Sequence, residues 1–463
     1  MSTYNSPGVY VEEVATLPAS VAQVATAIPA FLGYTKNNLS EPVRITSMAE
    51  FVAVCGGPDT AAASSLQIQI ASATVNSKTV YSIGGTIAYP TATMRSLLYY
   101  SMQLYFANGG GPCYVASTGV FTATPNKNHF VTAAGNALDK LKLEDEPTLL
   151  VPVDATLLGA TGYYDVVEQC LAQCNDLKDR FTIVDTVESN TSSNTDVEDL
   201  RDEIGNNYLS YGAAYYPYLN TTLTLPDEAV VFTGASTVTL AAAKLATSGA
   251  PADIMAQLKD QISKLVGDYL LTLPPSGAIA GIYAAVDRSR GVWKAPANVS
   301  INSVVEPEVR VTDAEQGDMN VDATSGKSIN AIRHFTGKGN FVWGARTLAG
   351  NDNEWRYVPV RRLYITVEES IAKATAFSVF EPNDANTWSK LKAMLENYLT
   401  NLWRQGALAG SKPEQAFFVN VGLGVTMVPD DILNGNLIIE VGMAAVRPAE
   451  FIILRFSHKM QEA

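Results

Sequence analysis

The residues in this sequence that could perform catalysis or bind a metal are few and scattered. His129, His334 and His458 are the 3 histidines, and none lies near a cysteine pair. Cys170 and Cys174 stand four positions apart, a spacing that lets one helix face bind a metal ion. The neighbouring positions of that face are apolar, however, which favours two small buried side chains. We therefore predict no zinc site and no other metal site.

The segment TSGKS, residues 324–328, is similar to the end of a phosphate-binding loop. That motif needs a glycine five positions before Gly326, where this chain has Val321. Without it the backbone N–H groups cannot surround a phosphate. Acidic pairs such as Glu368–Glu369 are typical of solvated faces, and no G-x-S-x-G motif is present. We therefore expect a polar surface loop here, and no nucleotide, cofactor or catalytic residue.

Composition excludes some classes of partner. The chain has 46 acidic and 32 basic residues, a formal net charge of −14. Such a chain lacks the basic face that binds nucleic acid or an anionic membrane. Charged residues make up only 17% and apolar residues 47%, which indicates surface buried in an assembly. The 4 cysteines form no disulfide framework, and the N-terminus resembles no signal peptide, so we expect folding in a reducing cytoplasm.

The middle of the chain predicts a parallel α/β sheet, because helices alternate there with apolar strands. The expected helices are 130–142, 163–177 and 197–206, each followed by a strand that ends by residue 218. Segments 58–93 and 218–252 are expected to be variable excursions, the first of them β, and residues 251–273 a long amphipathic helix.

The last 120 or so residues predict two helices followed by an antiparallel sheet. Residues 366–380 form the first helix, and residues 385–405 the second. One face of the second helix is apolar, with Trp388, Leu391, Leu395, Tyr398, Leu402 and Trp403. Alternating apolar residues then predict strands at 416–427, 436–443 and 450–458, with one buried face.

A short strand is expected near the N-terminus, within residues 6–14. Val9 and Val11 alternate with Tyr10 and Glu12, and no hairpin partner lies nearby in the sequence. Such a strand either frays or pairs with something distant.

Blocks along nearly the whole chain resemble the contractile tail sheath family of phage tails and extracellular injection systems. The strongest is PPSGAIAGIYAAVDRSRGVWKAPAN at 274–298. The other blocks, in order, are SPGVYVEEV (6–14), AIPAFLGYT (27–35), PVRITSMAEFVAVCGG, YFANGGGPCYV, FVWGARTLAG (341–350), YVPVRRLYITVEESI (357–371), FEPND (380–384) and the segment 433–459. Their order and spacing together make the resemblance specific.

The resemblance implies an α/β fold, α+β overall, in three parts. These are an N-terminal arm at 1–20, a larger outer α/β region with β excursions at 21–340, and an inner domain at 341–463. The inner domain would hold a mainly antiparallel sheet, helices built from both termini and a C-terminal arm. Subunits would form six-fold rings stacked helically around an inner tube, with baseplate and cap proteins at the ends. They would contract from a metastable state, without a cofactor, nucleic acid or membrane insertion.

The resemblance also suggests interface residues. Val9, Tyr10, Val11 and Glu12 would exchange strands with a neighbouring subunit, together with Phe451, Ile453 and Arg455 of the C-terminal arm. Lys390, Lys392 and Arg404 would face the tube, although an ordinary solvated face explains them equally well. The sequence leaves open whether the sheath belongs to a phage tail, an extracellular injection particle or a type VI-like machine. Residues 422–459 look closest to the extracellular systems. A soluble α/β enzyme or binding protein of unknown substrate is the alternative.

Overall fold

The computed structural model describes residues 21–59, 67–75, 77–83, 94–187, 193–224, 231–234, 238–239 and 271–454. The chain divides into a larger unit, residues 25–366 with 447–463, and a smaller unit, residues 1–24 with 367–446. It therefore passes between the units three times. Residues 341–366 cluster with the larger unit, and the predicted division into an arm, an outer region and an inner domain stays a prediction. Which region faces inward or outward in an assembly stays a prediction.

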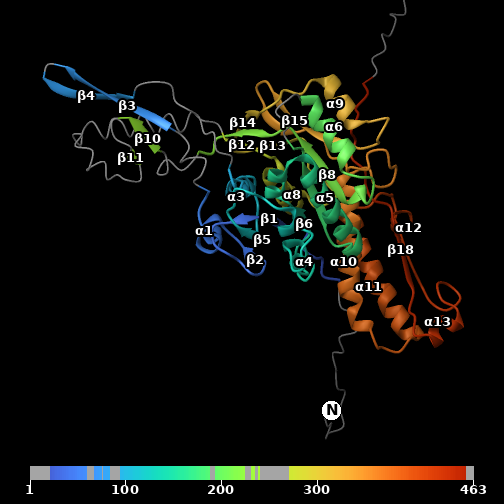
Figure 1. The fold of residues 1–463 in the computed structure, drawn as a ribbon. Coiled ribbons are helices and arrows are strands. Elements are labelled where there is room, and N and C mark those ends of the chain that lie inside the picture. Colours follow the sequence, from blue (N-terminus) through green and yellow to red (C-terminus); the bar gives the residue numbers. More distant parts are fainter. Residues whose placement is uncertain are drawn as a thin grey trace, which may run out of the picture. The chain divides into compact units, whose positions relative to one another are not determined.

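A mixed sheet forms the centre of the larger unit (Figure 1). Among the described residues it has nine strands, in the order β13-β16-β15-β8-β7-β6-β1-β5-β2. The bounds are β1 (Pro29–Thr35), β2 (Val43–Ile45), β5 (Cys113–Val120), β6 (Leu149–Val151), β7 (Phe181–Asp185), β8 (Gly212–Tyr216), β13 (Val299–Ser300), β15 (Ile329–Phe335) and β16 (Gly339–Val342). Pairing is parallel from β5 through β1, β6, β7 and β8 to β15, which confirms the predicted parallel sheet. β2 pairs antiparallel at one edge, and β16 followed by β13 pair antiparallel at the other.

Helices pack on the sheet of the larger unit. Their bounds are α1 (Met48–Cys55), α3 (Leu98–Ala107), α4 (Ala137–Leu141), α5 (Gly159–Leu177), α6 (Ser193–Glu203), α8 (Ser276–Arg290) and α9 (Asp313–Asn320). The expected helices at 163–177 and 197–206 are α5 and α6, with shifted ends. The helix expected at 130–142 was too long: α4 begins only at Ala137, because Gly135 just before it has a φ of 70°.

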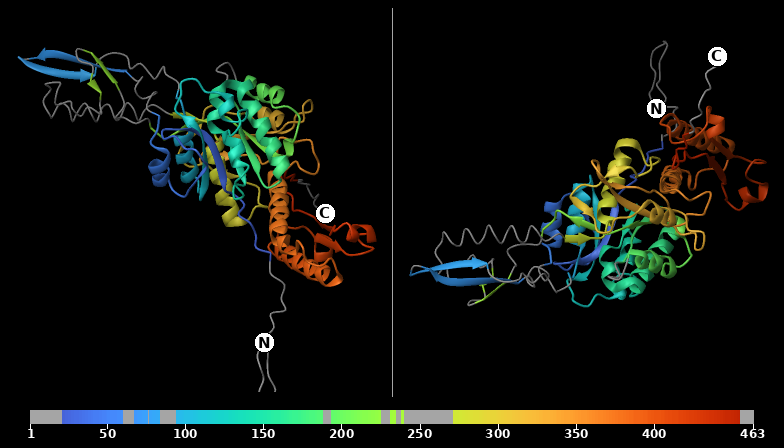
Figure 2. Two further views of the ribbon diagram at one scale, coloured as in Figure 1. Left: turned by 60° about the horizontal axis from the view of Figure 1, so that its bottom comes forward. Right: turned by 90° about the horizontal axis from the view of Figure 1, so that it is seen from above.

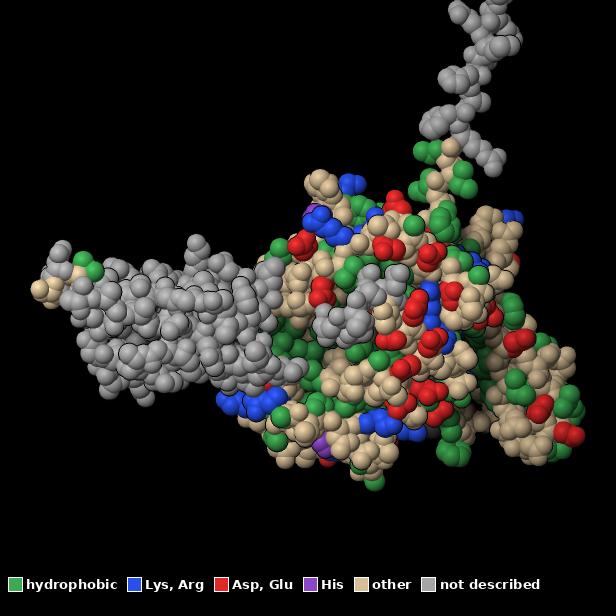
Figure 3. Space-filling model, turned by 45° about the horizontal axis from the view of Figure 1, so that its top comes forward, with side chains coloured by type: hydrophobic (Ala, Val, Ile, Leu, Met, Phe, Trp, Pro, Cys, Tyr) green, Lys and Arg blue, Asp and Glu red, His purple; other side chains and the backbone are tan. Residues whose placement is uncertain are grey.

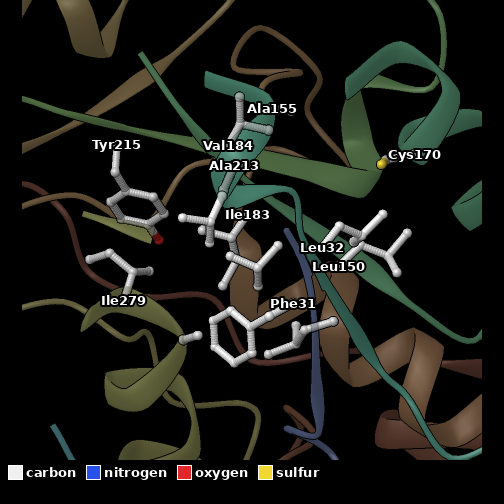
Figure 4. Packing of buried hydrophobic residues seen from close by; sticks show 14 of the residues in the cluster. Phe31, Leu32, Leu150, Ala155, Cys170, Ile183, Val184, Ala213, Tyr215 and Ile279 are labelled. Carbon is white, nitrogen blue, oxygen red and sulfur yellow. The ribbon is translucent and has the colours of Figure 1, made fainter. Parts of the chain in front are cut away.

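The core of the larger unit lies between strands and helices that are far apart in the sequence. Phe31 of β1, Ile183 of β7 and Ile279 of α8 point toward one another (Figure 4). All three side chains are fully buried. Strand β1 is buried along its whole length, as expected of a parallel strand covered on both faces.

Smaller sheets complete the larger unit. β9 (Leu219–Thr221) pairs with β12 (Leu271–Leu273) and β14 (Val304–Pro307). The helix expected at 251–273 lies mostly outside the described residues, but its end was wrong: β12 is a strand there, with Leu271 and Leu273 buried. In the 58–93 excursion, β3 (Gln67–Val75) pairs with β4 (Lys78–Ile83), as expected, and with β10 (Val231–Gly234), which pairs with β11 (Val238–Thr239).

The smaller unit contains helices and one strand pair (Figure 2). Its elements are the second half of α10 (Val358–Thr375), then α11 (Ala385–Arg404), α12 (Pro413–Ala416), β17 (Phe417–Val421), α13 (Pro429–Leu433) and β18 (Ile439–Met443). The helix expected at 385–405 is confirmed as α11. It begins at Asp384, whose carboxylate accepts a hydrogen bond from the Thr387 N–H.

Three expected elements near the C-terminus end early or do not form. The helix expected at 366–380 ends at Thr375, and Phe380 has a left-handed φ of 68°. The strand expected at 416–427 ends at Val421, because Gly422 and Gly424 both have positive φ. The strand expected at 450–458 was wrong for its described part: residues 451–454 have no regular structure and no partner strand within the described residues.

Candidate assembly interface

The residues that could have formed an active site are used within the larger unit. Cys170 and Cys174 are buried thiols on α5, and burial raises both pKa values, that of Cys174 to about 12. In the TSGKS loop, Lys327 is 3% exposed and its Nζ donates to the Arg201 carbonyl over 2.5 Å. Among the described residues, no group of three or more His, Cys, Asp or Glu side chains could hold a metal ion. The loop is therefore only partly the exposed polar loop that we expected.

The crevice at the carboxyl ends of β1 and β6 is filled by a carboxylate. Parallel α/β sheets usually bind ligands at such a point, where successive connections leave in opposite directions. Here the Asp154 carboxylate accepts hydrogen bonds from the N–H groups of Tyr34 (2.7 Å) and Leu97 (2.6 Å) and from the Ser96 hydroxyl (2.7 Å). Asp154 is fully buried, and burial raises its pKa to about 7 against the lowering effect of these bonds. The position therefore holds the fold together instead of a ligand.

Helix α11 presents the three cations predicted to face a tube. Lys390, Lys392 and Arg404 are all exposed, whereas Leu391 and Leu395 between them are fully buried. Within the described residues, Lys392 forms an ion pair with Glu396 at 3.9 Å, and no ion pair is found for Lys390 or Arg404. The helix thus offers a charged face above an apolar one.

Strands β17 and β18 form a two-stranded sheet within the described residues. Five residues of each strand pair in antiparallel register, from Phe417–Met443 to Val421–Ile439. Within the part of the chain that the structure describes, neither strand has a partner at its other edge. An open edge presents unpaired N–H and C=O groups that another strand can bind.

The smaller unit exposes several large apolar side chains that were not predicted from the sequence. Phe380 is fully exposed and Leu433 is 84% exposed. Other exposed members are Phe377, Val379, Phe418, Leu423, Val425 and Val428. The sequence FSVFEP at 377–382 contains apolar residues beyond the end of the helix, and the prediction of a helix over 366–380 includes most of them.

The C-terminal segment of the larger unit is also apolar and exposed. Phe451 and Ile453, both predicted exchange residues, are 69% and 76% exposed, and Ile452 and Leu454 are similar. Figure 3 shows hydrophobic side chains, in green, along the segment where the described chain gives way to grey at the top. Val9, Tyr10, Val11, Glu12 and Arg455 lie outside the described residues. Of the predicted exchange residues, the structure therefore describes only Phe451 and Ile453, and the strand exchange stays a prediction.

Comparison with known proteins identifies relatives of this chain. A family model described as the phage tail sheath C-terminal domain matches residues 350–459. The tail sheath protein of Vibrio phage KVP40 is 28% identical over 136 residues, and that of Enterobacteria phage T4 is 25% identical over 130 residues. These matches cover 20% and 19% of the two curated relatives.

Solved structures match almost the full length of the chain. The PVC sheath complex of an extracellular contractile injection system, in the contracted state, is 33% identical with a TM-score of 0.66 and covers 99% of both chains. The helical sheath of the anti-feeding prophage, also contracted, is 33% identical with a TM-score of 0.63 and covers 99% of this chain and 100% of that one. These relatives are structural proteins, and none of them favours the enzyme alternative. No described helix is both long and apolar enough to cross a membrane.

Proposed function

This chain belongs to the contractile tail sheath family, and we propose that it is the repeating subunit of a helical sheath that drives an inner tube through a cell envelope. The full-length likeness to a contracted PVC sheath at 33% identity is the observation that carries the proposal. Negative-stain microscopy of the chain, produced with and without its tube protein, tests it. We expect helical tubes, whereas compact monomers under both conditions would support a soluble α/β protein instead.

The proposal requires mechanical work without a bound fuel, and we infer a structural role, not an enzymatic one. A contact between different surfaces of identical subunits that does not close produces a helical filament. Work then comes from two packings of the same subunits, with a kinetic barrier that holds the higher one. In stacked six-fold rings, the small free energy released by each subunit would add up along the whole sheath.

We infer that neighbouring subunits are linked by strand exchange. The open edges of β17 and β18 would accept residues 6–14, with Val9, Tyr10, Val11 and Glu12, from another copy. Phe451, Ile453 and Arg455 would supply part of the same exchange. Main-chain hydrogen bonds give affinity in such β-addition, and alternate side chains give specificity.

Deletion of residues 1–14 tests the strand exchange. The truncated chain should remain folded, because the compact core described here begins at Ile28, but it should not polymerise. Circular dichroism checks the fold and electron microscopy the assembly. Normal tubes from the truncated chain would exclude an essential arm.

We infer that α11 contacts the tube through Lys390, Lys392 and Arg404. Exposed ion pairs contribute only about 0–1 kcal/mol each and weaken with salt, which suits an interface that must hold and then release. Reversing Lys390 and Lys392 to Glu should reduce co-assembly with the tube while the sheath still folds. Reversal of two exposed lysines of the larger unit, Lys36 and Lys142, is the control. Equal co-assembly of both variants would favour an ordinary solvated face.

The remaining partners follow from the same proposal. We infer baseplate and terminal cap proteins at the two ends of the sheath, and assembly in a bacterial cytoplasm. One solved relative, the PVC sheath complex, belongs to an extracellular contractile injection system, which supports a released injection particle as the final state.

A further inference from the structure

Glu450 is held by a buried arginine at the point where the C-terminal segment leaves the larger unit. Its carboxylate accepts hydrogen bonds from Arg346 Nε (2.9 Å) and Nη2 (2.6 Å), a two-pronged contact. Asn320 Nδ2 (2.8 Å) and the Tyr357 hydroxyl (3.2 Å) also donate to it. The Arg346 side chain is only 4% exposed. Immediately beyond this contact, Phe451 is 69% exposed.

A second buried arginine holds the chain at the N-terminal side of the same unit. Arg362 Nη2 donates to the Thr26 carbonyl over 2.7 Å. Both of its terminal nitrogens also bind the Asp287 carboxylate, at 3.0 and 2.6 Å, and its guanidinium lies 4.6 Å from the Tyr283 ring centre. Arg362 and Asp287 are 3% and 4% exposed. Burial of the chain begins just after this contact, at Ile28.

The two contacts share a buried guanidinium. At Glu450 the arginine makes a two-pronged contact with the carboxylate. At Thr26 it donates a single hydrogen bond to the carbonyl, and its two-pronged contact is with Asp287. Two-pronged arginine contacts are strong and directional, and a lysine cannot reproduce them. The next residue toward the chain end, Phe451 in one case and Ala25 in the other, is exposed.

We propose that Arg346–Glu450 and Arg362–Thr26 are the two anchors through which the terminal arms transmit load to the rigid body of the subunit. This inference rests on the proposed sheath function, since only an assembly linked by its arms pulls on these points. If the exchanged strand could detach progressively from its own subunit, contraction would lengthen the arm instead of moving the subunit. A buried arginine that holds the chain at the start of each arm opposes such detachment.

Spin labels beside each anchor test whether it holds the chain. All four native cysteines are buried, so a nitroxide on Ala449→Cys or Ala25→Cys labels selectively. Glu450→Gln keeps the side-chain shape but loses the charge, and Arg362→Lys keeps the charge but loses the planar fork. In the unassembled full-length chain, we expect a severalfold larger mobile fraction in the electron paramagnetic resonance spectrum for each variant at its own label.

Glu146→Gln is the matched control. Glu146 also accepts hydrogen bonds from an arginine, Arg44, and a tyrosine hydroxyl, Tyr114, but it lies apart from both arms in the sequence. This change should leave both labels as they are. Unchanged label mobility in Glu450→Gln and Arg362→Lys would overturn the anchors.

Triggered contraction tests the transmission of load. Sheaths built from either anchor variant should assemble but contract incompletely or break, whereas Glu146→Gln sheaths contract fully. Complete contraction of both anchor variants would overturn the load-bearing role. A wild-type chain that forms no sheath would contradict the proposed function separately, because the spin-label result is obtained on single chains.

Discussion

At the scale of single residues, buried carboxylates organise the larger unit. Asp154 binds the backbone of β1 and of the α3 N-terminus, and Asp185 accepts a hydrogen bond from the Ser276 N–H at the start of α8 over 2.8 Å. Burial raises the pKa of each to about 7. Both aspartates end an apolar strand in the sequence, which was the available signal. Their partners could not be predicted, because they lie about 60 to 120 positions away.

Asp154→Ala should destabilise the larger unit. It leaves several buried N–H groups without an acceptor, so we expect the free energy of unfolding to fall by about 3 kcal/mol. Chemical denaturation measures the loss. Asp176→Ala, at an exposed position of α5, should change it by less than about 0.5 kcal/mol. Equal effects of the two changes would contradict the role of Asp154.

The Glu450 contact predicts a pH dependence. Burial raises the carboxyl pKa, but hydrogen bonds from Arg346 and Asn320 outweigh burial, so the pKa is lowered from 4.5. A lowered pKa in the folded state means that the contact stabilises the fold fully above pH 4.5 and loses this effect as pH falls further. The stability difference between wild type and Glu450→Gln should therefore be large at pH 7 and shrink below pH 4.5. A difference that is constant across this range would exclude the ion pair as its source.

At the scale of elements, close packing of α3 against α8 depends on glycine. A Cβ at Gly277 would lie 2.6 Å from the Ser101 carbonyl oxygen, and one at Gly281 would lie 2.5 Å from that of Tyr105. The two glycines, four positions apart, let the helix backbones approach. The sequence block that contains them was recognised by resemblance, but its contact with α3 was not predicted.

Gly277→Ala should therefore cost about 1–3 kcal/mol through overpacking, despite the higher helix propensity of alanine. Gly317 on α9 is the matched control, because a Cβ there would meet nothing within 4 Å. Gly317→Ala should stabilise by up to about 1 kcal/mol. Thermal unfolding of both variants decides, and stabilisation by both would show that α3 and α8 are not tightly packed.

How well the elements were predicted depended on whether their partners are local. Helix α11 has a clear apolar stripe and an N-terminal Asp384, so its bounds were predicted nearly to the residue. Strand β1 was missed, because seven buried residues with Gly33 and Pro29 lack the alternation of a half-buried strand. Residues 451–454 form an apolar run typical of a strand yet have no partner strand within the described chain. A strand pattern whose partner belongs to another subunit yields a strand only after assembly.

At the scale of the whole molecule, we expect contraction to move each packed unit as a rigid body. Close-packed cores do not deform continuously without losing contacts. The strain would then fall on the segment 15–26, which has no charged residue and mostly small side chains. The two compact units and the open β17–β18 edges support this view, whereas the positions of subunits in the assembly could not come from one chain.

Cryo-electron microscopy of the same sheath, extended and contracted, tests this account most directly. We predict that each compact unit, residues 27–366 and 367–440 taken separately, superposes closely between the two states of one subunit. The helical lattice and the path of residues 15–26 should change instead. A large rearrangement inside either unit, with an unchanged path through residues 15–26, would contradict the account.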